Sequence, residues 1–252
     1  MMNRFCFLLL CVPALGLFGA CSSTSSTSGS VTPADGGGAD GAATTDASGG
    51  ATSCTKARAD LLIPIDKVST GAVTVLSDTG GVKKLYIDAS GGGTANAVKN
   101  PRIYVDLEAG ARVDLTDTTA TMSTAWDLAL KRDKIFTNSG DAGPGMGGAM
   151  LIDKTFSAVN AAEANGTALV PEKFFDADCN PQLDQTQTVS TTFADWYDYD
   201  QVTHIPTPKD VTYVVAGGTG KKYKVAITAY DGLPDGGKGM ATAFYILEVT
   251  AL

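Results

Sequence analysis

The stretch Lys222-Tyr-Lys-Val-Ala-Ile-Thr-Ala-Tyr230 alternates in side-chain character, and this alternation decides the fold class. Successive side chains of a strand point to opposite faces of its sheet. One face here carries Tyr223, Val225, Ile227 and Ala229, and the other carries Lys222, Lys224, Ala226, Thr228 and Tyr230. A loop at residues 231–239 leads into a second run, whose apolar face carries Ala243, Tyr245, Leu247 and Val249. We predict a β-hairpin with one face in the core and one in solvent.

Short apolar or alternating runs of the same kind recur along the chain. Outside the hairpin they occupy residues 61–65, 72–76, 84–88, 102–107, 125–130, 134–137 and 211–216. Turns rich in Gly, Asp and Pro separate them. Helical patterns are confined to residues 155–165, and residues 193–199 suit either a helical turn or a strand. We therefore predict an all-β fold, an antiparallel sheet sandwich or partly closed barrel with at most one or two short helices.

The first residues have the form of a secretory signal. Arg4 precedes an uncharged apolar stretch, residues 5–18, that is too short to span a bilayer as a stable helix. Small residues stand before Cys21, as in a bacterial lipobox, so we predict a lipoprotein signal peptide at residues 1–20 and lipidation of Cys21. The alternative is an ordinary cleaved signal with an accidental cysteine. No inner-membrane retention aspartate follows Cys21, so we expect lipid anchoring to the outer membrane, at the cell surface or in a shed form.

Residues 22–53 contain only Ser, Thr, Gly, Ala, Asp, Val and Pro. Such a segment cannot bury enough apolar surface to offset its backbone entropy. We predict that residues 21–53 are a lipidated cysteine followed by a flexible tether, and that residues 54–252 form a single β domain.

Charge and motifs exclude several classes of function. The formal net charge is -8, and no cluster of Lys and Arg is present, so neither nucleic acid nor anionic lipid is an expected partner. The acyl chains at Cys21 would supply the membrane contact. The chain lacks a Gly-x-Ser-x-Gly elbow, a His-Glu-x-x-His helix and a Cys/His zinc cluster. We predict that it is not an enzyme.

The five cysteines sort by position. Cys6 and Cys11 lie in the signal, Cys21 is the lipidation site, and Cys54 and Cys179 remain. An even pair in an exported domain predicts a disulfide. Closing so long a loop would contribute on the order of 4 kcal/mol in the chain-entropy model.

The middle of the chain has a distinctive order of motifs. A strand carrying Trp126 and Asp127 precedes a second short strand, the turn Asn138-Ser-Gly140 and the glycine-rich loop 140–148. The loop lacks the Lys-Ser/Thr ending of a phosphate loop, which argues against nucleotide binding. The order of motifs resembles the HmuY family of haem-binding surface lipoproteins. Segments 196–199, 211–215 and 221–230 are similar to later parts of that family, whereas residues 156–192 match it poorly.

The resemblance implies a lipoprotein that captures haem in a groove between β-elements and passes it to an outer-membrane receptor. Haem, or host and environmental proteins that carry it, would be its partners. Family members hold the iron from two sides, with histidines in the best-known members and methionines in some relatives. Since His204 is the only histidine, two-histidine ligation within one chain is excluded. The candidate ligands are Met146, Met150 and His204, with Met240 as a further possible opposing ligand.

Each candidate also has a structural interpretation. A lone histidine is more often a hydrogen-bonded structural residue. Met146 lies between glycines and suits a functional loop or a side chain that touches nothing, whereas Met150 and Met240 suit packing. Trp126 and Trp196, with the neighbouring tyrosines of Trp196, suit cross-strand packing more than stacking on a porphyrin or sugar. The alternative function is a haem-independent structural or adhesive surface module on the same fold.

Overall fold

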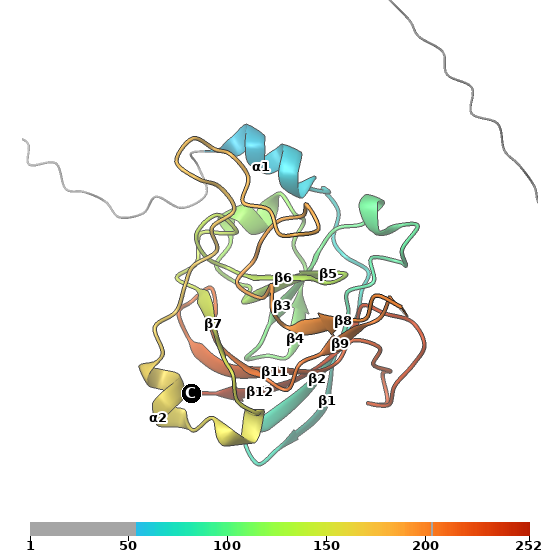
Figure 1. Ribbon diagram of the computed structural model, residues 1–252, viewed down its shortest axis with the longest axis vertical. Coiled ribbons are helices and arrows are strands. Elements are labelled where there is room, and N and C mark those ends of the chain that lie inside the picture. The colour runs from blue at the N-terminus through green and yellow to red at the C-terminus, as the bar shows by residue number, and fades with distance from the viewer. Residues whose placement is uncertain (1–53, 203) are drawn as a thin grey trace, which may run out of the picture. The chain divides into compact units, whose positions relative to one another are not determined.

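The computed structural model describes residues 54–202 and 204–252 (Figure 1). The predicted signal peptide, the lipidated Cys21 and the tether lie outside these described residues. In the described part, no helix is long and apolar enough to cross a membrane.

Strands make up most of the regular structure in the described part. They are β1 (Val73–Thr79), β2 (Val82–Asp88), β3 (Ile103–Asp106), β4 (Ala111–Val113), β5 (Leu128–Lys131), β6 (Lys134–Thr137), β7 (Gly148–Ile152), β8 (Tyr197–Tyr199), β9 (Pro206–Pro208), β10 (Thr212–Ala216), β11 (Lys222–Ala229) and β12 (Phe244–Ala251). The helices are α1 (Thr55–Leu62) and α2 (Ala161–Gly166), with short 3-10 turns η1 (Ala97–Lys99), η2 (Thr119–Met122) and η3 (Phe156–Ala158).

The strands form two main sheets. One has the order β1-β2-β12-β11-β10-β7 and the other has the order β4-β3-β5-β6, and all of their pairings are antiparallel. The hairpin β8-β9 forms a separate pair of strands that is hydrogen-bonded into neither sheet. Neither sheet closes into a barrel, so the prediction of an antiparallel all-β sandwich with at most two short helices is confirmed. Figure 1 shows α1 beside the smaller sheet and α2 beside the larger one.

The predicted hairpin exists as β11 and β12. Tyr223, Val225 and Ile227 point into the main core, where they meet buried residues of the smaller sheet. A β-bulge between Ile227 and Ala229 then shifts the alternation by one residue. Tyr230 therefore enters the main core, and Ala229 packs on the opposite face. The predicted faces of these two residues were wrong, because the sequence pattern does not show the bulge.

The outer face of this hairpin is less exposed to solvent than predicted. The segment that contains η3 and α2 covers this side of the larger sheet. On β10, the strand next to β11, Val214 packs against Val159 and Ala164. The amino group of Lys224 donates to the carbonyls of Phe156 and Val159, at 2.8 and 2.9 Å. The α2 helix lies within the predicted helical stretch 155–165 apart from its last residue, and Asn160 caps its N-terminus by accepting from Glu163 N–H.

One predicted strand was wrong. Residues 61–65 do not pair with any strand, because Leu62 ends α1 and packs in a second core cluster beneath it. Five apolar residues are too few to distinguish a strand from the end of a helix. The predicted disulfide is confirmed: Cys54 and Cys179 are bonded, with Cα atoms 5.4 Å apart. It ties the start of α1 to a loop 125 residues later in the sequence.

Two polar side chains join the sheets at one end. Asp127, just before β5, accepts from Leu107 N–H at 2.8 Å and from Gly218 N–H at 3.1 Å. Asn138, just after β6, donates to Trp126 O at 2.9 Å and accepts from Gly145 N–H at 3.0 Å. Both side chains are buried, so each depends on these bonds for its polar atoms. We call this contact the Asp127–Asn138 junction.

The glycine-rich loop packs tightly against the junction. A Cβ at Gly145 would lie 2.5 Å from Asn138 O and 2.6 Å from Gly218 Cα, and one at Gly147 would lie 2.5 Å from Asn138 O. Backbone atoms occupy these positions, so a side chain cannot be accommodated by rotation. The glycines are needed for close backbone packing.

We expect Gly147→Ala to destabilise the fold by about 1–3 kcal/mol, because its methyl group would overlap backbone atoms. Gly166→Ala is the matched control, since a Cβ there meets nothing within 4 Å at the end of α2. Urea unfolding of both variants measures the difference. Equal stability of the two variants would contradict the close-packing explanation.

Replacing both Cys54 and Cys179 by Ser should lower the free energy of unfolding by about 4 kcal/mol, since the bridge closes a very long loop. Urea unfolding should give the same loss for the unmodified protein under reducing conditions. A loss in the variant that exceeds the loss on reduction would show that the serines themselves perturb the fold.

Glu172 gives a pH-dependent prediction. Its buried carboxylate accepts from the N–H and hydroxyl groups of Thr137 and Thr192, and burial raises its pKa. Glu172 therefore loses its proton at a lower pH in the unfolded chain than in the folded protein. As a result, the free energy of unfolding falls as the pH rises from about 4 through the folded pKa. The stability of the natural protein relative to Glu172→Gln should accordingly decrease between pH 4 and 7. A relative stability that rises with pH would contradict this assignment.

Candidate functional site

A groove of about 810 Å³ opens on the surface. It is far larger than the hollow of about 190 Å³ beneath α1, and it lies within the usual range of small-molecule sites. Four segments line it: the β5–β6 turn, the loop 183–186, residues between 194 and 206 that include residues of β8 and the first residue of β9, and the region from the end of β11 to the start of β12. The groove therefore forms only when distant parts of the chain come together.

The floor of the groove is aromatic. Trp196 is buried, and its ring lies 4.5 Å from that of Tyr197 and 5.0 Å from that of Tyr230, between ring centroids. Its indole Nε1 donates to Asp133 O at 3.0 Å, which holds the β5–β6 turn against the floor. Trp196 and Trp126 are both core residues, as the packing interpretation predicted. Tyr197 and Tyr230 both line the groove, but Tyr197 is partly exposed, whereas Tyr230 is only 3% exposed and belongs to the core beneath it.

Charged groups stand at the side of the groove. Lys134 binds Asp184 at 2.5 Å and lies 3.5 Å from Asp133, so one cation is shared by two carboxylates. Although partial burial opposes it, the hydrogen bond from Lys134 holds the pKa of Asp184 below its usual value. Arg132 donates to Thr94 Oγ1 and forms no ion pair with any described residue. Its guanidinium remains available to an anionic ligand.

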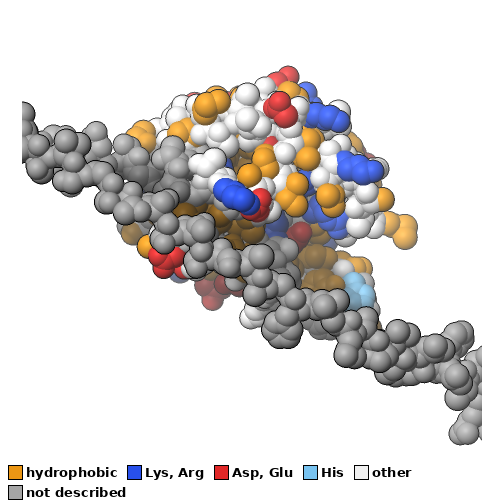
Figure 2. Space-filling view, turned by 90° about the horizontal axis from the view of Figure 1, so that it is seen from above, with side chains coloured by type: hydrophobic (Ala, Val, Ile, Leu, Met, Phe, Trp, Pro, Cys, Tyr) orange, Lys and Arg blue, Asp and Glu red, His pale blue; other side chains and the backbone are white. Residues whose placement is uncertain are grey.

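The rim carries the single histidine. The Tyr199 hydroxyl and His204 Nδ1 are 2.9 Å apart, and both residues line the groove. They lie on the β8–β9 hairpin. Of the stretch 193–199, which suited a helical turn or a strand, residues 197–199 are the strand β8, whereas the residues before them form a turn in which Trp196 N–H donates to Phe193 O. Figure 2 shows the pale-blue histidine at the surface beside hydrophobic side chains. Val202 and Ile205, at the hairpin tip, are 87% and 50% exposed.

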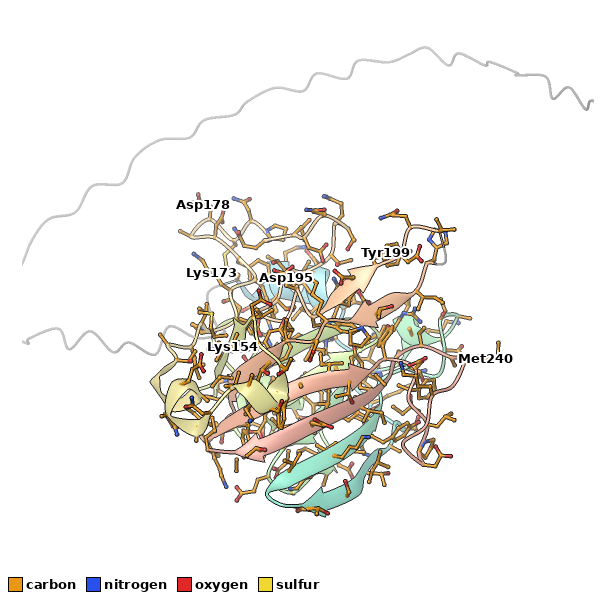
Figure 3. All side chains as sticks on the ribbon, turned by 60° about the horizontal axis from the view of Figure 1, so that its bottom comes forward. Lys154, Lys173, Asp178, Asp195, Tyr199 and Met240 are labelled. Atoms are coloured by element: carbon orange, nitrogen blue, oxygen red, sulfur yellow. A yellow bond between two sulfur atoms is a disulfide. The ribbon has the colours of Figure 1, made fainter. Side chains whose placement is uncertain are left out.

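The structure places the four candidate ligand residues in different parts of the molecule. His204 lies in the groove, and Met240 belongs to the loop whose Thr242 lines the same groove. Met240 is fully exposed and points away from the ribbon (Figure 3), so its predicted packing was wrong. Met146 and Met150 do not line the groove.

Met146 lies at the far end of β11 from the groove. Its N–H donates to Gly218 O, and its exposed side chain lies beside Gly220, in the turn that precedes β11. Tyr230, at the other end of β11, lines the groove. Seven residue steps along the strand separate the two ends, roughly 23 Å at about 3.3 Å per residue. Met146 and His204 are therefore not placed to hold one ligand between them.

Met150 faces the outer side of the larger sheet. It pairs with Val214 on β10, and its neighbours Ala149 and Leu151 point into the main core.

Sequence reasoning missed Arg132 and Asp184 as groove residues, because nothing near them in the sequence marks a site. Among the described residues, no group of three or more His, Cys, Asp or Glu side chains could hold a bare metal ion.

Comparison with protein families decides the relationship of this chain. The family model described as HmuY protein matches residues 99–245, which is more than half of the chain. This chain belongs to the HmuY family. The match includes every segment that lines the groove, as well as the Asp127–Asn138 junction. The resemblance inferred from the order of motifs is therefore confirmed. A search of curated proteins found no match.

Solved structures are similar only at a distance. A Bacteroides fragilis NCTC 9343 chain, described as a candidate lipoprotein, is 13% identical with a TM-score of 0.42, over 71% of this chain and 94% of its own. A candidate HmuY-like haem-binding protein from Bacteroides vulgatus ATCC 8482 is 18% identical with a TM-score of 0.42, over 71% and 96%. The apo HmuY analogue of Tannerella forsythia is 15% identical with a TM-score of 0.33, over 74% and 93%. These likenesses are too remote to locate a site in this chain.

Proposed function

We propose that this HmuY-family protein binds haem in the groove beside the β8–β9 hairpin. The observation that carries the proposal is the convergence of Tyr199, His204 and an aromatic floor on one groove of sufficient volume. Membership of the family supports a haem-binding role at the level of the family.

The residues of the groove fit the chemistry of haem. The partly exposed ring of Tyr197 offers apolar surface to a flat macrocycle, and the buried Trp196 and Tyr230 support that ring from the core. Arg132 can pair with a propionate carboxylate, and the Tyr199–His204 pair offers donor atoms to an axial position. Haem would supply an iron that accepts such a donor. The protein's contribution is to bind and orient it.

Of the three predicted ligand residues, His204 alone lines the groove, so the proposal assigns it a part in holding haem. Met146 and Met150 are placed on other surfaces and are not needed. We further propose that lipidated Cys21 anchors the protein to the outer membrane. There it would capture haem from carrier proteins for delivery to a receptor, by binding and without catalysis.

Filling the groove should abolish haem capture. Ala194 is exposed and lines the groove, so Ala194→Trp should weaken haemin binding at least about tenfold, or about 1.4 kcal/mol. The measurement is an absorption titration of the purified protein with haemin, with the unsubstituted protein expected to show a saturable one-to-one Soret shift.

Two control variants sharpen this titration. Ala162→Trp places the same ring at an exposed position of α2, outside the groove, and should bind normally. Met146→Ala should also bind normally, whereas loss of binding in that variant would move the site to the glycine-rich loop. A spectrum equal to that of free haemin would reject haem binding and favour a haem-independent surface module, for which the exposed Val202 and Ile205 provide an apolar contact area.

A further inference from the structure

The position of Tyr199 on β8 fixes the side of the groove on which the Tyr199–His204 pair lies. Tyr197 and Tyr199 are two residues apart on β8, so their side chains project from the same face of the strand. Both line the groove. Tyr199 therefore lines the groove from the same side as Tyr197. His204 lies next to Tyr199, near the tip of the hairpin. Figure 3 shows Tyr199 at this outer edge.

The backbone holds the imidazole in this position. His204 has a φ of 58°, in the left-handed region that few residues other than glycine adopt. Its N–H donates to Asp200 O at 2.8 Å, and Asp200 N–H donates to Ile205 O at 3.3 Å. Val202 N–H donates to the Asp200 side chain at 2.7 Å. A less favourable conformation kept by a hydrogen-bonded turn is a common feature of binding sites.

We propose that Tyr199 Oη is the atom that binds the haem iron, and that His204 Nδ1 accepts its proton. The inference rests on the proposed haem groove. When the oxygen–iron bond forms, the O–H bond of Tyr199 would break and its proton would move along the hydrogen bond to Nδ1, which lies 2.9 Å from the phenol oxygen. The resulting imidazolium remains hydrogen-bonded to the phenolate oxygen. The water or anion that held the iron position leaves.

Chemistry favours the phenol over the other donors as the ligand. No methionine lines the groove, so no thioether is available there. The imidazole nitrogen that faces Tyr199 is already used by the hydroxyl. Tyrosinate is an established axial ligand of haem, and an anionic oxygen is a hard donor that suits a trivalent metal. The groove should therefore select trivalent metalloporphyrins, with ferric haem bound more tightly than ferrous haem.

Four forms of the protein test the assignment: the unsubstituted protein, Tyr199→Phe, His204→Gln and Tyr213→Phe. The last removes the hydroxyl of a core tyrosine that does not line the groove and has no hydrogen-bond partner among the described residues, and it serves as the matched control. Tyr199 and His204 are exposed, so their variants should unfold at the same temperature as the unsubstituted protein. The probes are haemin, Ga(III)-protoporphyrin IX and Zn(II)-protoporphyrin IX, followed by absorption titration. Resonance Raman spectra of the ferric complexes report a phenolate–iron bond directly.

The unsubstituted protein and Tyr213→Phe should show the phenolate signature and bind Ga(III)-protoporphyrin about as tightly as haemin. Tyr199→Phe should lose the signature and at least about tenfold in affinity for both trivalent probes. His204→Gln should keep the signature and lose affinity to a smaller extent. Zn(II)-protoporphyrin should bind weakly, without change in Tyr199→Phe, and reduction by dithionite should weaken haem binding.

The two proposals fail in different ways. If the unsubstituted protein binds haemin without a phenolate signature, and His204→Gln loses binding while Tyr199→Phe does not, the imidazole is the ligand. That result overturns the tyrosinate assignment and leaves the haem groove standing. If no probe binds the unsubstituted protein, the haem groove itself is rejected, and the tyrosinate assignment with it.

Discussion

The Asp127–Asn138 junction is the constraint on which the rest of the structure depends. It places a buried carboxylate and a buried amide between the ends of β5 and β6 and the turn that joins β10 to β11. Burial raises the pKa of Asp127, so the carboxylate is tolerated only because backbone N–H groups donate to it. A Cβ at Gly217 would lie 1.7 Å from Asp127 Oδ1. The two sheets meet here through hydrogen bonds between backbone groups and these two polar side chains.

This junction explains why the family motif has its particular order. The Trp-Asp pair, the Asn-Ser-Gly turn and the glycine-rich loop are separate in sequence, but they form one hydrogen-bonded unit. The glycines of the loop permit close approach of backbone to backbone. Met146 is an exposed residue on the outside of this unit. The most recognisable part of the sequence is therefore structural in origin.

Because the sheets are joined at one end of β11, a binding groove can develop at the other. There the chain inserts the hairpin β8-β9 and the loop before β12, and Trp196 anchors the hairpin to Tyr230 and to the β5–β6 turn. The bulge in β11 turns Tyr230 inward at this point, next to Trp196. Rigid aromatic residues thus support a rim of exposed polar and apolar side chains. A binding protein gains specificity from such a rim without disturbing its core.

By itself the sequence determined the all-β class, the disulfide, the strands of the hairpin and the family. These features depend on alternation over a few residues, on an even pair of cysteines and on the order of short motifs. Only the tertiary structure decided which residues share a site. Arg132, Asp184, Tyr199 and Tyr230 meet because the order of strands and a single bulge bring four distant segments together. The separation of Met146 from His204 has the same cause, since both lie in loops and only the length of β11 sets the distance between those loops. Local patterns carry no information on such distances.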